Sequence, residues 1–92
     1  MNYAGLHAIV KGNVQGVGYR WFAARSAQQV NLTGWAKNLP GGEVEVKAFG
    51  DKGALNSLIK QLSVGPSFSK VNDVVVRWIE YEPSHTEFNI KN

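Results

Sequence analysis

The period at which apolar residues recur changes along the chain, which predicts alternating strands and helices. From Leu6 to Val10 every second residue lies on a uniformly apolar face, as is typical of a strand with one buried side. After a glycine-rich turn, apolar residues recur at three- and four-residue spacing: Phe22, Ala23, Ala27 and Val30. This spacing predicts a helix to about Val30 that is buried on one side, with Trp21 packed at the edge of the buried face. Asn31 tolerates the left-handed conformation and is the predicted helix stop.

The same two periods predict the remaining elements. They indicate strands over Leu32–Lys37, Glu43–Phe49 and about Val71–Tyr81, and a helix with an apolar stripe at Leu55, Leu58, Ile59 and Leu62. Asp51 precedes this second helix and is predicted to be its N-cap. After Pro83 we expect a short closing strand with Phe88 and Ile90 facing inward.

The order of these elements is β-α-β-β-α-β plus a short final strand. It predicts an α+β fold of the ferredoxin-like sandwich type, with an antiparallel sheet and two helices on one face. Strands one and two, joined by the first helix, run in the same direction and therefore end at the same edge of the sheet. We expect Arg20, which follows the first strand, and Asn38, which ends the second, to face a common pocket.

Composition limits the classes of function. The chain has 92 residues, of which 43% are hydrophobic and 18% charged, which suits one folded domain over residues 1–92. It has no cysteine, so disulfides and thiolate metal sites are excluded. No apolar run approaches the length that spans a membrane, and we expect a soluble, cytoplasmic monomer. The net charge of +3 suits an anionic ligand, but its basic residues are scattered, which argues against nucleic acid as a partner.

The stretch from Gly12 to Arg20 carries the strongest chemical signal. A strand, a glycine-punctuated turn and a helix N-terminus place several backbone N–H groups around one point, which favours an anion. Arg20 in the first helical turn opposes the helix dipole by about 0.3–1 kcal/mol, and a bound phosphate would remove that conflict. On spacing alone the alternative is equally good: Gly16 and Gly18 form a tight turn, and Arg20 points into solvent.

Asn38 suggests what could happen to such an anion. Its amide can orient a water molecule but is no strong base, and neither stretch contains Asp, Glu or His. A reaction without a protein base or acid suits an acyl phosphate, whose carboxylate leaving group is stable at neutral pH. No carboxylate cluster indicates a metal, and no cofactor is expected. Taken alone, however, Asn38 is better explained as a turn residue before Leu39-Pro40.

Two segments resemble the signatures of the acylphosphatase family. Val10-Lys11-Gly12-Asn13-Val14-Gln15-Gly16-Val17-Gly18-Tyr19-Arg20 is similar to the first signature. The second is matched by Gly34-Trp35-Ala36-Lys37-Asn38, followed by Gly42, Val44 and Gly50. Both occur in the expected order, and the similarity extends over nearly the whole chain.

The resemblance implies a function and a set of site residues. It implies hydrolysis of a small-molecule acyl phosphate, with Arg20 holding the phosphate, Asn38 positioning the attacking water, and a cradle formed by Gln15, Gly16, Val17, Gly18 and Tyr19. Inorganic phosphate or sulfate would then compete for the site. No metal and no phosphoenzyme are implied, and a substrate oxygen would take the proton of the water. Tyr19 departs from the usual phenylalanine, so its extra hydroxyl needs water or a partner.

Two other functions fit parts of the sequence. A ferredoxin-like module could keep the cradle and bind anions without turnover. The open sheet face could instead bind single-stranded RNA, as this topology can. The aromatic residues do not cluster in an RNA-reading strand, and the paired signatures favour the enzyme.

Overall fold

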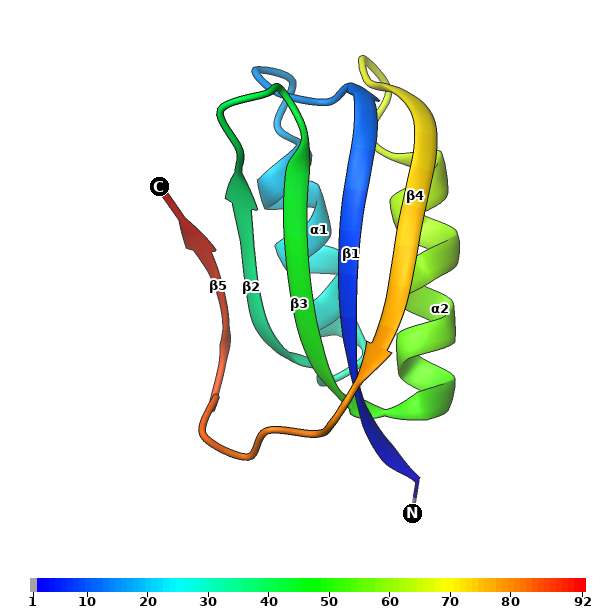
Figure 1. Ribbon diagram of the computed structural model, residues 1–92, viewed down its shortest axis with the longest axis vertical. Coiled ribbons are helices and arrows are strands. Elements are labelled where there is room, and N and C mark those ends of the chain that lie inside the picture. Colours follow the sequence, from blue (N-terminus) through cyan, green and yellow to red (C-terminus); the bar gives the residue numbers. More distant parts are fainter. Residues whose placement is uncertain (1) are drawn as a thin grey trace.

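The computed structural model describes residues 2–92, and within them five strands and two helices follow the predicted order (Figure 1). The elements are β1 (Tyr3–Asn13), α1 (Tyr19–Gln29), β2 (Thr33–Asn38), β3 (Val44–Asp51), α2 (Lys52–Val64), β4 (Lys70–Ile79) and β5 (Phe88–Lys91). The order βαββαβ plus a short final strand confirms the predicted fold class. Neither helix in this part of the chain is long and apolar enough to cross a membrane.

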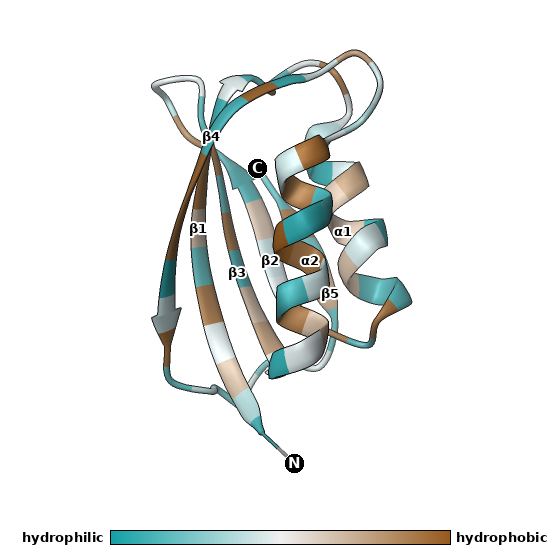
Figure 2. Ribbon diagram, turned by 90° about the vertical axis from the view of Figure 1, so that its right-hand side faces the viewer, coloured by the Kyte–Doolittle hydropathy of each residue, from teal (hydrophilic) through white to brown (hydrophobic). Residues whose placement is uncertain are grey.

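The strands form a single sheet in the order β4-β1-β3-β2-β5. Every pair is antiparallel except β2 with β5, which is parallel. Both helices cover one face of the sheet, and the other face is open (Figure 2). Because β1 and β2 each run antiparallel to β3, they are parallel to one another. The β1–α1 loop and the β2–β3 turn therefore lie at the same end of the sheet, as predicted (Figure 1).

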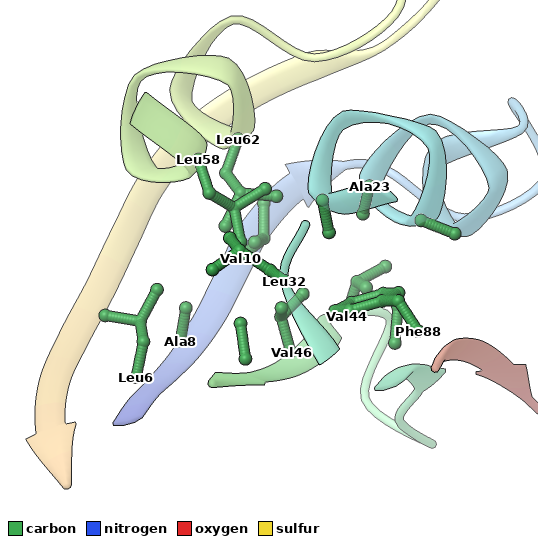
Figure 3. Packing of buried hydrophobic residues seen from close by; sticks show 14 of the residues in the cluster. Leu6, Ala8, Val10, Ala23, Leu32, Val44, Val46, Leu58, Leu62 and Phe88 are labelled. Atoms are coloured by element: carbon green, nitrogen blue, oxygen red, sulfur yellow. The ribbon is translucent and has the colours of Figure 1, made fainter. Parts of the chain in front are cut away.

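The hydrophobic core lies between the sheet and the helices. Figure 3 shows aliphatic side chains of β1 and β3 pointing toward Leu58 and Leu62 of α2 and toward Ala23 of α1. Burying each such Leu or Val side chain stabilises the fold by about 1.5–3 kcal/mol. Helix α1 contributes mainly alanines to this layer: Ala23, Ala24 and Ala27. Its small buried face lets the helix lie close against the strands, which fixes the position of its first turn.

Two expectations about side chains are corrected. Trp21 is not packed at the edge of the buried face but is 59% exposed, because the alanines define that face and place Trp21 on the flank beside β5. Ile90 pairs with Ala36 and so faces the helix layer, yet it is 43% exposed because β5 is the edge strand. Phe88 is buried as expected. Asn31 ends the helical segment with a φ of 60°, in the left-handed region, as predicted.

Candidate active site

The β1–α1 loop owes its shape to two glycines. Gly16 and Gly18 have φ values of 76° and 77°, in the left-handed region that residues with a Cβ rarely adopt. A Cβ on either would meet no atom within 4 Å, so glycine is needed here for backbone conformation and not for space. Gly18 is the N-cap residue of α1, and no side chain caps the helix. The first turn of α1 therefore begins with its backbone N–H groups uncovered.

The N–H groups of this loop and helix start are not used within the protein. From Gln15 to Trp21, no backbone N–H donates to a backbone or side-chain acceptor among the described residues. The first helical hydrogen bond is from the Phe22 N–H to the Gly18 carbonyl, at 3.0 Å. Unpaired N–H groups at a helix N-terminus attract an anion, because their dipoles are already fixed in place. A turn that satisfied its own N–H groups would leave no such site.

Arg20 lies in the first turn of α1 and is half-buried. Its Nη1 donates to the backbone carbonyl of Lys91, at the end of β5, at 2.7 Å. This bond is to a neutral acceptor, and Arg20 forms no ion pair within residues 2–92. A guanidinium has five N–H donors in a planar fork, so most of its donors remain for a ligand. The C-terminal strand thus orients the guanidinium without neutralising its charge.

Asn38 is the last residue of β2, where it pairs with Val44 of β3. Two backbone hydrogen bonds close the turn that follows: Leu39 N–H to the Glu43 carbonyl at 2.8 Å, and Gly42 N–H to the Leu39 carbonyl at 3.1 Å. The Asn38 side chain makes no hydrogen bond to any described residue. The alternative explanation of Asn38 as a turn-forming side chain therefore has no contact to support it, and its amide is free to bind a ligand or water.

Arg20 and Asn38 line the same pocket, which has a volume of about 160 Å³. The lining comprises Val14, Gly16, Gly18, Tyr19, Arg20, Trp21, Asn38 and Ile90. The topology predicted that the two polar residues would meet at this edge of the sheet. Of these lining residues, only Tyr19 and Arg20 have titratable side chains, and none is a carboxylate or a histidine.

Gln15 and Val17 do not line the pocket with their side chains. The Gln15 amide crosses to the neighbouring turn and donates to the carbonyls of Leu39, at 2.7 Å, and Glu43, at 2.9 Å. Val17 is half-buried and packs against the core. The Gln15 side chain holds the loop to the turn beside Asn38, and the place of both residues in the predicted cradle concerns their backbone N–H groups.

Tyr19 is buried, and its hydroxyl has a partner. It donates to the backbone carbonyl of Leu62 in α2 at 2.6 Å. Burial raises the pKa of the phenol above its ordinary value, which keeps the hydroxyl protonated as a donor. Tyr19 is therefore neither a base nor a nucleophile in the pocket.

Four parts of the site were not among the predicted site residues: Val14, Trp21, Ile90 and the Lys91 carbonyl. Trp21 follows Arg20 directly, but its helical position predicts packing at the edge of the buried face. Nothing in the sequence indicates that the C-terminal strand would reach α1, because that contact depends on β5 pairing in parallel with β2. Within residues 2–92 no group of three or more His, Cys, Asp or Glu residues is arranged to hold a metal.

Comparison with known proteins identifies the family to which the chain belongs. The family model described as "Acylphosphatase" matches residues 6–90, a range that includes the loop, Arg20, Asn38 and β5 up to Ile90. The chain belongs to the acylphosphatase family. Its curated relatives are named acylphosphatases, and acylphosphatases are hydrolases. The chain is therefore identified as an enzyme.

Individual acylphosphatases match over nearly their whole length. The chain is 49% identical over 85 residues to the acylphosphatase of Chlorobaculum tepidum, covering 92% of each chain. It is 51% identical over 75 residues to that of Thermus thermophilus, covering 82% of this chain and 85% of the relative. The crystal structure of acylphosphatase from Bacillus subtilis superposes with a TM-score of 0.93 at 38% identity, covering 97% of this chain and 99% of that one.

Proposed function

We propose that the chain hydrolyses acyl phosphates to a carboxylate and inorganic phosphate without a metal ion. The observation that carries the proposal is that Arg20, Asn38 and the unpaired N–H groups of the β1–α1 loop surround one pocket. Membership of the acylphosphatase family supports the same reaction.

The phosphoryl group binds between the loop and Arg20. Backbone N–H groups donate to two of its oxygens while the guanidinium, held by the Lys91 carbonyl, supplies positive charge. Charge in phosphoryl transfer is concentrated on the equatorial oxygens, so fixed donors around them stabilise the transition state. The bound anion also relieves the unfavourable position of Arg20 near the positive end of α1.

Asn38 positions the attacking water. Its amide oxygen accepts a hydrogen bond from the water, and its amide nitrogen is available to donate to a phosphoryl oxygen. The water oxygen bonds to phosphorus, the bond from phosphorus to the acyl oxygen breaks, and a phosphoryl oxygen takes the proton. The products are a carboxylate and dihydrogen phosphate, and no protein group changes its protonation state. Holding the two reactants in this geometry adds to the electrostatic stabilisation by the loop and Arg20.

The pocket lining supports acyl phosphates over phosphate monoesters as the proposed substrates. A monoester has an alkoxide leaving group that requires an acid or a metal. The pocket lining has no carboxylic acid or imidazole to supply a proton, and the Tyr19 hydroxyl is committed to the Leu62 carbonyl. A carboxylate leaves without such help.

Benzoyl phosphate hydrolysis in the presence of a chelator tests the proposal. We expect turnover that is unaffected by the chelator and is inhibited competitively by inorganic phosphate or sulfate. An alkyl phosphate monoester such as benzyl phosphate, whose leaving group is an alkoxide, serves as the control substrate and should react far more slowly. Absence of benzoyl phosphate turnover in protein that still binds phosphate would leave an anion-binding module and reject the enzyme.

A further inference from the structure

A second hollow continues from the phosphoryl pocket along the flank of α1. It has a volume of about 430 Å³ and lies between α1 and β5, lined by Trp21, Ala24, Arg25, Gln28, Phe88, Asn89 and Ile90. Trp21 and Ile90 belong to both linings, so the two hollows adjoin. A substrate phosphorus bound at Arg20 would place its acyl group at the mouth of this acyl groove.

The walls of the acyl groove suit a flat apolar segment. Trp21, Ala24, Phe88 and Ile90 give it an apolar surface, and Trp21 and Ile90 are exposed there. The Gln28 amide is already engaged, since it donates to the Phe88 carbonyl at 3.2 Å. Exposed aromatic and aliphatic side chains beside a polar pocket are typical of the part of a site that holds the non-reacting portion of a substrate.

Arg25 supplies a positive charge in the wall of the same groove. Its guanidinium carbon lies 5.3 Å from the centre of the Trp21 ring, a cation–π contact that holds the side chain along the groove. Within residues 2–92 it forms no hydrogen bond and no ion pair. No carboxylate lines the groove, and α1 contains two arginines and no acidic residue.

Helix geometry sets the separation of the two arginines. Trp21, Arg25 and Gln28 are spaced by four and three residues and so share one face of α1. With 3.6 residues per turn and a rise of about 1.5 Å per residue, Arg25 lies about 7.5 Å along the axis and about 140° around it from Arg20. The adjoining linings, which share Trp21 and Ile90, place both arginines beside one continuous hollow. A molecule with a phosphoryl group at one end and an anionic group at the other could contact both guanidinium groups.

We infer that the acyl groove binds the acyl group of the substrate, and that Arg25 favours acyl phosphates bearing a second anionic group remote from the phosphoryl group. This inference rests on the proposed hydrolysis of acyl phosphates. It names Arg25 as a residue that determines specificity, in a place separate from the phosphoryl-binding loop.

The kinetic test compares benzoyl phosphate with 4-carboxybenzoyl phosphate, whose carboxylate lies across a rigid ring from the phosphoryl group. The quantity measured is kcat/KM for 4-carboxybenzoyl phosphate divided by kcat/KM for benzoyl phosphate. It is determined in the wild type and in Arg25→Gln. Because Arg25 is exposed, we expect the ratio to fall by about threefold at low ionic strength, as for other solvent-exposed ion pairs. The difference should shrink as salt screens the charges. A ratio that is the same in both proteins would overturn the inference.

Arg77→Gln is the matched control for charge. Arg77 belongs to β4 and pairs with His7 of β1, on the sheet face opposite the helices. Its removal changes the net charge equally but leaves the groove intact, so the ratio should stay at the wild-type value. An equal fall in both variants would mean that overall charge, and not the groove, sets the preference.

A binding measurement separates this inference from the proposed function. Benzylphosphonate and 4-carboxybenzylphosphonate cannot be hydrolysed at an acyl bond, and their dissociation constants can be measured by NMR titration. We expect the carboxylated probe to bind about threefold more tightly to the wild type than to Arg25→Gln, with shifts at the Trp21 indole N–H. If the carboxylated probe binds more tightly to the wild type but no acyl phosphate is hydrolysed, the proposed function is rejected and the role of Arg25 in the groove is kept. Turnover of benzoyl phosphate without a preference for the carboxylated probe would do the reverse.

Discussion

The two helices differ in their N-cap residues. Asp51 caps α2, where its carboxylate accepts a hydrogen bond from the Ala54 N–H at 3.2 Å. Gly18 precedes α1, which has no side-chain cap. Asp51 has an extended backbone with φ −62° and ψ 134°, as N-cap residues usually do, while Gly18 is left-handed. An acidic N-cap also complements the helix dipole at α2, and Arg20 opposes it at α1.

The difference separates a structural helix start from one that can bind a ligand. At α2 the side chain occupies a donor that would otherwise face solvent, and this stabilises the fold. A cap of that kind at α1 would occupy the N–H groups that a phosphoryl oxygen needs. The start of α1 is stabilised in another way: the Tyr19 ring is buried, and its hydroxyl binds a carbonyl in the last turn of α2. The four predictions below test this contrast.

Arg20→Gln should have the largest effect. Loss of the guanidinium leaves the loop N–H groups without a positive charge to balance the phosphoryl group, and we expect kcat/KM for benzoyl phosphate to fall by about 10³-fold or more. Binding of inorganic phosphate, measured by isothermal titration calorimetry, should be lost as well. The free energy of unfolding should change little or rise, because the cation no longer opposes the dipole of α1. Near-normal phosphate affinity in this variant would place Arg20 outside the site.

Asn38→Ala should lower the rate without removing the anion site. Without the amide the water is no longer oriented, and we expect kcat to fall by about 10²- to 10³-fold. Inorganic phosphate should still act as a competitive inhibitor, with an inhibition constant within a few-fold of the wild-type value. Steady-state kinetics with phosphate as inhibitor gives both quantities. If kcat and phosphate affinity fell together, Asn38 would act on the loop and not on the water.

Most of the framework behind these two predictions follows from sequence. Strand and helix periods are local properties, so the order of elements could be predicted, and the direction of β1 and β2 then places Arg20 and Asn38 at one edge. The N-cap role of Asp51 also depends on a local pattern and is confirmed. The glycines at positions 16 and 18 predict a turn, but only coordinates establish that its N–H groups have no acceptor.

The parts that could not be predicted depend on contacts between distant segments. Helical spacing places Trp21 at the edge of the buried face, because spacing shows which residues share a face but not where a neighbouring edge strand ends. The Lys91 carbonyl lies 71 positions from Arg20 and contributes a backbone atom, which leaves no trace in residue type. The Gln15 amide likewise binds carbonyls of a turn far along the chain.

Tyr19→Phe should destabilise the protein by removing the contact that stabilises the start of α1. The Leu62 carbonyl belongs to the last turn of α2 and loses its partner, which costs about 1–2 kcal/mol of unfolding free energy in urea denaturation. A pH dependence should accompany this loss. Because the pKa of Tyr19 is raised in the folded state, its contribution is complete below the unfolded value of about 10 and is lost as pH rises above it. Wild-type stability should therefore fall more steeply above pH 10 than that of the variant. Parallel curves would mean that burial does not perturb this phenol.

Asp51→Ala should give the smallest effect and the clearest contrast with Arg20→Gln. Removing the N-cap carboxylate leaves the Ala54 N–H without its acceptor, and we expect unfolding free energy to fall by about 1 kcal/mol. Asp51 lies at the opposite end of the sheet from the loop, so kcat and KM for benzoyl phosphate should keep their wild-type values. Inorganic phosphate should raise the melting temperature of this variant by as much as that of the wild type, because the α1 site is intact. In Arg20→Gln, inorganic phosphate should leave the melting temperature unchanged. If phosphate instead stabilised Asp51→Ala more than the wild type, the uncapped start of α2 would bind the anion as well, and an uncapped helix start without the glycine loop and Arg20 would be enough to make the site.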